Sequence, residues 1–435
     1  MIDQVKTPPI SKNVASAKAG LKRLRQSDFV RKVAETFATR IALLVFGMGT
    51  SILITRSLGP AGRGTFAVAA TIGAICLQFG NLGLSSSNTY FAAKDRSLLP
   101  KLLGNTLFVS FAGGTAALVL LFGLAQIWPF LLPIRGLILL LALAAVPFGL
   151  AALFMQNILL GIQDVRGYNK YDLVNAALTL GCILTLVLTR RLSVAGVLGV
   201  ILLIGILSFI LMLRRCHSHF SGRLQWSPAL LKSSVGYGVK FYLANFFAFL
   251  VLRSDMILVD NQLGKTQAGI YSIAITLASL IAILPGVVGS ILFPRLSASN
   301  DAASKWRETQ RALLGVGAIT GAAALVSALF AAPFTRIAYG PAFSAAVPAY
   351  LWLLPGTLFL GLNSALSAYV SSVQIPWRLV GIYFAAFLLN MGLNLLFLSR
   401  YGIVAASINS SLCYGFSYIA LWLLVARPMA KRAAA

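Results

Sequence analysis

Two stretches of the sequence decide the fold: LGPAGRGTFAVAATI at residues 58–72 and LGKTQAGIYSIAITL at residues 263–277. They align at an offset of 205 residues, with identical Leu, Gly, Gly, Ala and Thr in register. A second pair, LVLTRRLSVA at 186–195 and LFLSRYGIVA at 396–405, aligns at an offset of 210. Two pairs at nearly the same offset indicate that one unit occurs twice in the chain.

Each unit contains six apolar stretches, and a run of about 20 apolar residues can cross a bilayer core as a helix. The chain is 58% hydrophobic and 11% charged, with a mean hydropathy of +0.86, whereas soluble proteins carry about 25% charged residues. The sequence therefore predicts an all-α polytopic membrane protein with about twelve transmembrane helices. The predicted spans are 37–57, 65–91, 102–127, 136–161, 170–189, 194–213, 235–261, 267–293, 311–332, 343–372, 379–398 and 403–425.

Because six is an even number, the two units are expected to cross the membrane in the same orientation. We expect two six-helix lobes around a central cavity, an architecture typical of transporters that alternate access. The predicted parts are a basic cytoplasmic N-terminal tail without regular structure (1–36), an N-lobe (37–213), a cytoplasmic linker (214–234), a C-lobe (235–425) and a cytoplasmic C-terminal tail (426–435).

The net charge of +26 would suggest nucleic-acid binding in a soluble chain, but here it indicates membrane orientation. With both termini inside, 25 of the 36 Lys and Arg residues fall on the cytoplasmic side and 8 in the outer loops. Cytoplasmic loops are enriched in Lys and Arg, so both termini are predicted to be cytoplasmic, next to anionic membrane lipids. No nucleic-acid partner is expected.

Two blocks carry a family resemblance: ITRSLGPAGRGTFAVAATI at 54–72 and LRSDMILVDNQLGKTQAGIYSIAITLASLIAILPGVVGSILFPRLS at 252–297. They resemble the polysaccharide-transporter branch of the multidrug/oligosaccharidyl-lipid/polysaccharide flippase superfamily, in particular the Wzx-type O-antigen and exopolysaccharide flippases of bacterial inner membranes. The resemblance implies export of an undecaprenyl-pyrophosphate-linked oligosaccharide repeat unit from the cytoplasmic to the periplasmic leaflet. It also implies a multi-pass inner-membrane location and polysaccharide polymerase machinery as a partner.

Ionisable residues inside spans are costly and usually face a cavity, so they are the first site candidates. Arg253 lies 12 residues past Phe241, about 18 Å along a helix. Asp255 is about 200° around that helix, whereas Asp260 returns to the face of Arg253. We interpret Arg253 as a pyrophosphate contact and Asp255 or Asp260 as an acid that couples transport to a proton or sodium ion. The alternative is an interhelical ion pair. The resemblance, which includes an Arg-x-Asp pattern here, favours the first interpretation.

Other polar residues in the spans are weaker candidates. Arg40 could line the cytoplasmic entrance or reach the lipid headgroups. Two sets could contact sugar hydroxyls or only join helices. They are Gln78, Asn81, Ser85 and Asn88, spaced i, i+3, i+7, i+10 along one predicted helix, and Asn390 and Asn394. Ser364, Ser367 and Ser371 are interpreted as bonding back to their own helix.

Two alternatives to a flippase stay open. A cation-coupled multidrug exporter of the same superfamily would favour an acidic cavity. A polytopic enzyme of a polysaccharide pathway is disfavoured, because the outer loops are short and His217 and His219 fall in a predicted inner loop. The segment 59–65 lacks the lysine of a phosphate-binding loop, and no enzyme activity, cofactor or metal is expected.

Overall fold

The computed structural model describes residues 10–127, 133–299, 301–373 and 376–429, and these residues contain helices and no strand. The helices are α1 (Ile10–Gly80), α2 (Leu84–Lys94), α3 (Leu99–Phe108), α4 (Gly114–Ile127), α5 (Gly136–Gly161), α6 (Val165–Leu188), α7 (Val194–His217), α8 (Pro228–Ala298), α9 (Ala302–Ala338), α10 (Ala346–Val373) and α11 (Trp377–Leu421). Short helical pieces lie at Arg96–Leu98, Val109–Gly113, Pro341–Phe343 and Trp422–Ala426. Within these ranges, nine helical segments are long and apolar enough to cross a membrane, which confirms an all-α polytopic membrane protein.

Three of the long helices change direction at a glycine. Gly59 in α1 has φ 66° and ψ −178°, Gly264 in α8 has φ 83° and ψ 173°, and Gly402 in α11 has φ 65° and ψ −157°. Positive φ is readily adopted only by glycine, and each break falls between two predicted spans. Gly59 and Gly264 are equivalent positions of the repeat, and their similar backbone angles support the duplication. The total of twelve spans stays a prediction.

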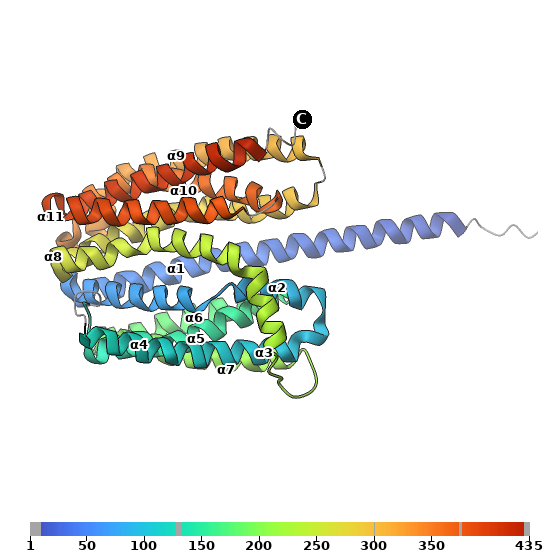
Figure 1. Ribbon diagram of the computed structural model, residues 1–435, viewed down its shortest axis with the longest axis horizontal. Helices are drawn as coiled ribbons and strands as arrows, with labels where there is room; N and C mark the ends of the chain where they lie inside the picture. The colour runs from blue at the N-terminus through green and yellow to red at the C-terminus, as the bar shows by residue number, and fades with distance from the viewer. Residues whose placement is uncertain (1–9, 128–132, 300, 374–375, 430–435) are drawn as a thin grey trace, which may run out of the picture.

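Two expectations about the N-terminal third are wrong. Residues 10–36, expected to lack regular structure, form the start of α1, and Figure 1 shows this part extending away from the bundle. The predicted span 65–91 is not one helix, because α1 ends at Gly80 and α2 starts at Leu84. Leu82 and Gly83 have φ 48° and 81°, so the backbone turns between the two helices.

The helices form two groups (Figure 1). Helices α1 to α7 form one group, the N-lobe, and α9 to α11 with most of α8 form the other, the C-lobe. The end of the bundle that carries Gly59 and Gly264 is called the outer end, and the end at which α5 finishes and α8 begins is called the inner end. The inner end is the one predicted to face the cytoplasm.

The core connects the two lobes through α1 and α8. Val68 and Ile72 of α1 and Val259, Tyr271 and Ala274 of α8 belong to one cluster of buried apolar side chains. At the inner end, the start of α8 packs against the N-lobe. Burying these side chains positions the second half of α1 beside α8, where the candidate site lies.

Candidate functional site

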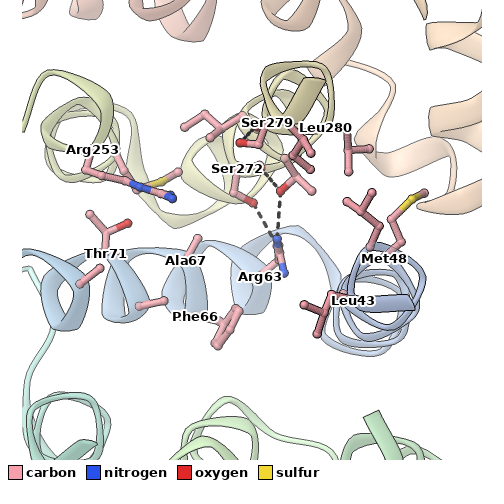
Figure 2. A pocket seen from close by; sticks show the side chains of 18 residues that line it. Leu43, Met48, Arg63, Phe66, Ala67, Thr71, Arg253, Ser272, Ser279 and Leu280 are labelled. Atoms are coloured by element: carbon pink, nitrogen blue, oxygen red, sulfur yellow. Dashed lines mark hydrogen bonds between the residues drawn. The ribbon is translucent and has the colours of Figure 1, made fainter. Parts of the chain in front are cut away.

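A pocket of about 450 Å³ lies between α1 and α8, at the junction of the two lobes (Figure 2). Both halves of each helix contribute to its lining. None of its lining residues is acidic. The polar lining residues are Arg63, Thr71, Arg253, Ser272, Thr276 and Ser279. The pocket therefore carries two positive charges among hydroxyl groups.

Arg63 is the functional candidate that sequence reasoning missed. Only 7% of its surface is exposed, and its guanidinium donates to Ser272 Oγ (3.1 Å) and Thr276 Oγ1 (3.4 Å) of α8. The guanidinium also lies 5.5 Å from the ring centre of Phe66. Among the described residues, no carboxylate lies within ion-pair distance of Arg63. A buried cation without a counter-charge is costly, and such residues usually mark a ligand or ion pathway.

Arg253 reaches the same pocket from the first half of α8, and Figure 2 shows its side chain beside Thr71. Its side chain is exposed to the pocket, with the guanidinium 5.9 Å from the ring centre of Phe249. Arg253 thus lines a cavity, and its contact with a pyrophosphate stays a prediction. No described carboxylate lies within 4 Å of Arg253, so the alternative of an ion pair is not supported for this residue.

Asp255 lies in the core next to this pocket, with 2% of its surface exposed. Its carboxylate accepts hydrogen bonds from Tyr271 OH (2.5 Å), Ser410 Oγ (3.2 Å) and the backbone N–H of Met256 (2.8 Å). Asp255 and Arg253 both line a neighbouring cavity of about 210 Å³. Asp255 therefore joins α8 to α11 through hydroxyl groups and has no cation within ion-pair distance among the described residues.

Asp260 does not reach the pocket, which corrects the expectation that it could act with Arg253. Its carboxylate is buried and pairs with Lys265, on the other side of the break at Gly264. The Lys265 Nζ also donates to the carbonyl of Pro133 at 3.2 Å. Asp260 shares the helix face of Arg253 but lies about two turns nearer the outer end, so a structural ion pair describes it better.

The Arg40 side chain is 46% exposed, so contact with lipid headgroups stays a prediction. Its guanidinium donates to Tyr168 OH (3.1 Å) and lies 3.8 Å from the carboxylate of Asp172, both on α6. Gln156 of α5 donates to the other oxygen of that carboxylate at 2.8 Å. Arg40 thus joins helices within the N-lobe, and it lines neither of the pockets at Arg253.

The predicted stripe of four polar residues does not form, because the turn at residues 81–83 separates Gln78 from the others. Asn81 lies in the turn, and its Oδ1 accepts from the N–H of Ser85 in the first turn of α2 (3.2 Å). Asn88 is buried, and its amide donates to Thr106 Oγ1 of α3 at 3.1 Å. These contacts favour the alternative interpretation, in which the side chains join helices.

Asn390 and Asn394 are likewise buried within the C-lobe. Asn394 Nδ2 donates to Asn390 Oδ1 (3.2 Å), and Asn409 Nδ2 donates to Asn394 Oδ1 (3.1 Å). The three amides lie on the two halves of α11 and connect them across the break at Gly402. A role in binding sugar has no support from these contacts.

A larger cavity of about 1000 Å³ lies between the lobes towards the inner end. Serines 364, 367 and 371 line it, so they do not only bond to their own helix, as the sequence suggested. Its polar lining is rich in hydroxyl and amide groups and carries one cation, Lys240. The polar lining residues are Ser86, Thr89, Asn157, Tyr237, Lys240, Asn245, Asn363, Ser364, Ser367, Ser371 and Tyr383.

The lobes touch at the outer end through two equivalent glycines of the repeat. A Cβ atom on Gly64 would lie 2.8 Å from the backbone N of Gly269, and one on Gly269 would lie 2.9 Å from the N of Gly64. Gly64 also packs on the carbonyl of Lys265, and Gly269 on the carbonyl of the equivalent residue, Pro60. This reciprocal contact leaves no room for a side chain, so the structure is closed at the outer end.

These features define a class of protein. Solved structures with the same fold include an inward-facing multidrug resistance MATE family transporter of the MOP superfamily, with 14% identity, a TM-score of 0.71, and coverage of 90% of this chain and 95% of that one. The lipid II flippase MurJ in an inward closed conformation has 14% identity, a TM-score of 0.68, and coverage of 91% and 87%. A MOP superfamily transporter from Pyrococcus furiosus has 13% identity, a TM-score of 0.68, and coverage of 93% and 96%. The chain thus has the fold of MOP-superfamily transporters.

The family itself is shown by the sequence. Residues 53–348 match the family described as polysaccharide biosynthesis protein, and the chain belongs to that family. The match includes both copies of the repeat segment and both pocket arginines. No curated protein matches the sequence.

Proposed function

We propose that this protein is a flippase that moves a polyprenyl-pyrophosphate-linked oligosaccharide repeat unit, with undecaprenyl as the lipid, across the bacterial inner membrane. The observation that carries the proposal is the pocket with Arg63 and Arg253 and no acidic lining residue. Guanidinium groups bind phosphate oxygens through paired hydrogen bonds, and a pyrophosphate offers anionic oxygens to both arginines. Family membership supports a role in the synthesis of a surface polysaccharide such as O-antigen or exopolysaccharide.

The two inter-lobe spaces suit the two parts of such a headgroup. The larger cavity at the inner end offers hydroxyl and amide groups, which hydrogen-bond sugar hydroxyls, and a volume suited to several sugar rings. The arginine pocket lies nearer the outer end, where the lobes are closed. In our proposal the headgroup enters from the cytoplasmic side, and rocking of the lobes then opens the outer end, while the polyprenyl chain stays in lipid.

Asp255 is our candidate for coupling to a proton or sodium ion. Its carboxylate is held by two hydroxyl groups and one N–H, next to the cavity that Arg253 also lines. Binding of a cation there would change the bonds between α8 and α11, which both belong to the C-lobe. A polysaccharide polymerase would receive the exported unit, since the family acts in polysaccharide synthesis.

A cation-coupled multidrug exporter is the second candidate, favoured by the shared fold and by the buried acid Asp255. Export of cationic drugs is disfavoured by the pocket, because its two arginines repel a cation. The two functions predict different phenotypes for a deletion of the gene. A flippase deletion loses surface polysaccharide and accumulates the lipid-linked unit on the cytoplasmic side, whereas an exporter deletion becomes drug-sensitive with normal polysaccharide.

Complementation of that deletion tests the site. The wild-type chain should restore surface polysaccharide, and Arg63→Ala and Arg253→Ala should not, although both proteins reach the membrane. Arg190→Ala is the matched control, because Arg190 is an exposed arginine at the outer end and lines neither inter-lobe space. Normal polysaccharide in the deletion strain, or in both pocket variants, would overturn the proposal.

A further inference from the structure

A groove of about 420 Å³ lies at the inner end, between the first turns of α6 and the last turns of α7. It shares no lining residue with the arginine pocket or with the large inter-lobe cavity. Three cations line it: Arg166 and Lys170 from α6 and Arg215 from α7.

No lining residue of the groove is acidic, but Asp164 lies beside it and pairs with one of the three cations, Arg215. Asp164, just before α6, accepts from Arg215 Nε at 2.8 Å and from the N–H of Gly167 at 3.0 Å. Its Oδ2 also lies 3.1 Å from His219 Nε2. Asp172 of α6 is held by Arg40 of α1 and by α5. When Asp164 is counted against the three cations, the described residues at the groove still carry a net positive charge.

Below the cations the groove lining is mainly apolar, and its polar members there are Tyr171 and Ser208. Val174, Leu211 and Met212 form the apolar part of the lining. One helical turn deeper in the membrane, Leu178 of α6 and Leu207 of α7 are 37% and 39% exposed and lie on the same helix faces as Val174 and Leu211. Cations at the membrane surface followed by a continuous apolar strip suit a molecule with an anionic headgroup and a hydrocarbon chain.

We propose that this groove is a binding site for an anionic phospholipid of the cytoplasmic leaflet. Arg166, Lys170 and Arg215 hold the headgroup phosphate, and the apolar strip holds an acyl chain. Basic pockets between transmembrane helices at the cytoplasmic surface are the setting in which such headgroups bind. The groove is separate from the spaces proposed to bind the lipid-linked oligosaccharide, so this proposal does not depend on the proposed function.

The test measures lipid binding to the purified full-length chain in detergent by native mass spectrometry, with phosphatidylglycerol, phosphatidylcholine and glycerol phosphate as probes. Phosphatidylglycerol should bind tightest, phosphatidylcholine more weakly, and glycerol phosphate weakest because it lacks the acyl chains. One cation near an anionic lipid contributes a factor of about five in affinity, so Arg166→Gln with Lys170→Gln should weaken phosphatidylglycerol binding about 25-fold.

Two further variants serve as controls for charge and for folding. Arg190→Gln with Arg191→Gln removes two exposed cations from the opposite end of α6 and should leave binding unchanged. If the double groove variant does not fold, the exposed Lys170→Gln alone should weaken phosphatidylglycerol binding about fivefold. Equal binding of phosphatidylglycerol by the groove variants and the wild type, or equal binding of phosphatidylcholine, would overturn the proposal. Glycerol phosphate binding as tight as the lipid would also overturn it, because the site would then take free phosphate.

Discussion

Replacing Gly64 by alanine is expected to drive the two lobes apart at the outer end. The new Cβ would lie 2.8 Å from the backbone N of Gly269 and closer still to the carbonyl of Lys265. Ordinary contacts of a carbon atom begin near about 3.4 Å, so the contact with Gly269 alone requires the two backbones to separate by about 0.6 Å, and the contact with the Lys265 carbonyl requires more. Neither neighbour can rotate away, because both are main-chain atoms.

The size of the effect follows from comparing the two conformations of the transporter. Overpacking of this kind costs about 1–3 kcal/mol, and it acts only when the outer end is closed. The higher helix propensity of alanine acts equally in both conformations and cancels. The ratio of outward-open to outward-closed molecules should therefore rise about 5- to 150-fold. Gly269→Ala should give a similar shift, because its contact with Pro60 and Gly64 is the reciprocal one.

Distances between spin labels report this shift. Cysteines replacing Arg190 in the N-lobe and Tyr401 in the C-lobe place labels on exposed positions near the outer end, in a chain whose native cysteines are replaced. Double electron–electron resonance should show a longer distance gaining population in Gly64→Ala and in Gly269→Ala. Gly181→Ala is the matched control, since its Cβ would meet no atom within 4 Å. Unchanged distances in both variants would refute the closure of the outer end by these glycines.

Three further predictions concern single side chains. Arg63→Ala and Arg253→Ala should each weaken binding of a short-chain polyprenyl pyrophosphate about 10- to 150-fold, because a hydrogen bond to a charged group contributes about 1.5–3 kcal/mol. Arg63→Lys should have an intermediate effect. Calorimetry on the purified protein measures these affinities. The Asp255→Asn variant should fold, because the amide oxygen still accepts from the hydroxyl groups. Its transport activity in vesicles should lose its dependence on a proton or sodium gradient. A transport activity that still depends on the gradient would exclude Asp255 as the coupling group. Asp164 lies outside the membrane spans: burial raises its pKa, but hydrogen bonds from Arg215 and neighbouring groups outweigh this and lower the pKa to about 2. A carboxylate with a lowered pKa stabilises the fold at pH values above its ordinary pKa near 3.8, and this stabilisation is lost as the pH falls to about 2. Asp164→Asn should therefore lower the free energy of unfolding by about 1 kcal/mol at pH 7, after solvent screening. Thermal melts should show the difference between variant and wild type vanish towards pH 2.

The membrane fold was predictable because its signals are long and repeated. Apolar runs locate helices by length, and the repeat located the turns at Gly59 and Gly264 at equivalent positions. The turn at residues 81–83 was missed because hydropathy does not register it. Gly83 is the N-cap of α2 and has a positive φ, and Asn81 accepts a hydrogen bond from the first turn of α2. The local signal for a helix boundary was therefore present inside the apolar run.

The candidate site was predictable only in part. Arg253 is isolated deep in a span, and its cost there made it stand out. Arg63 was counted as a loop residue because it lies four residues after a predicted turn. Its position at the start of a helical face of small residues, Ala67, Ala70 and Ala74, was the available signal. The ion pair of Asp260 with Lys265 could not be found, because it depends on how the chain bends at Gly264.

The reciprocal contact of Gly64 and Gly269 has a consequence for how such a chain arises. Contacts between equivalent residues across a twofold axis are the kind that join two copies in a homodimer. A single six-helix unit carrying this glycine would have the surface needed to pair with its own copy. In such a dimer one mutation changes both sides of the contact at once. Joined in one chain, the two halves can diverge separately, and an arginine can stand at position 63 while its counterpart, Ala268, stays small.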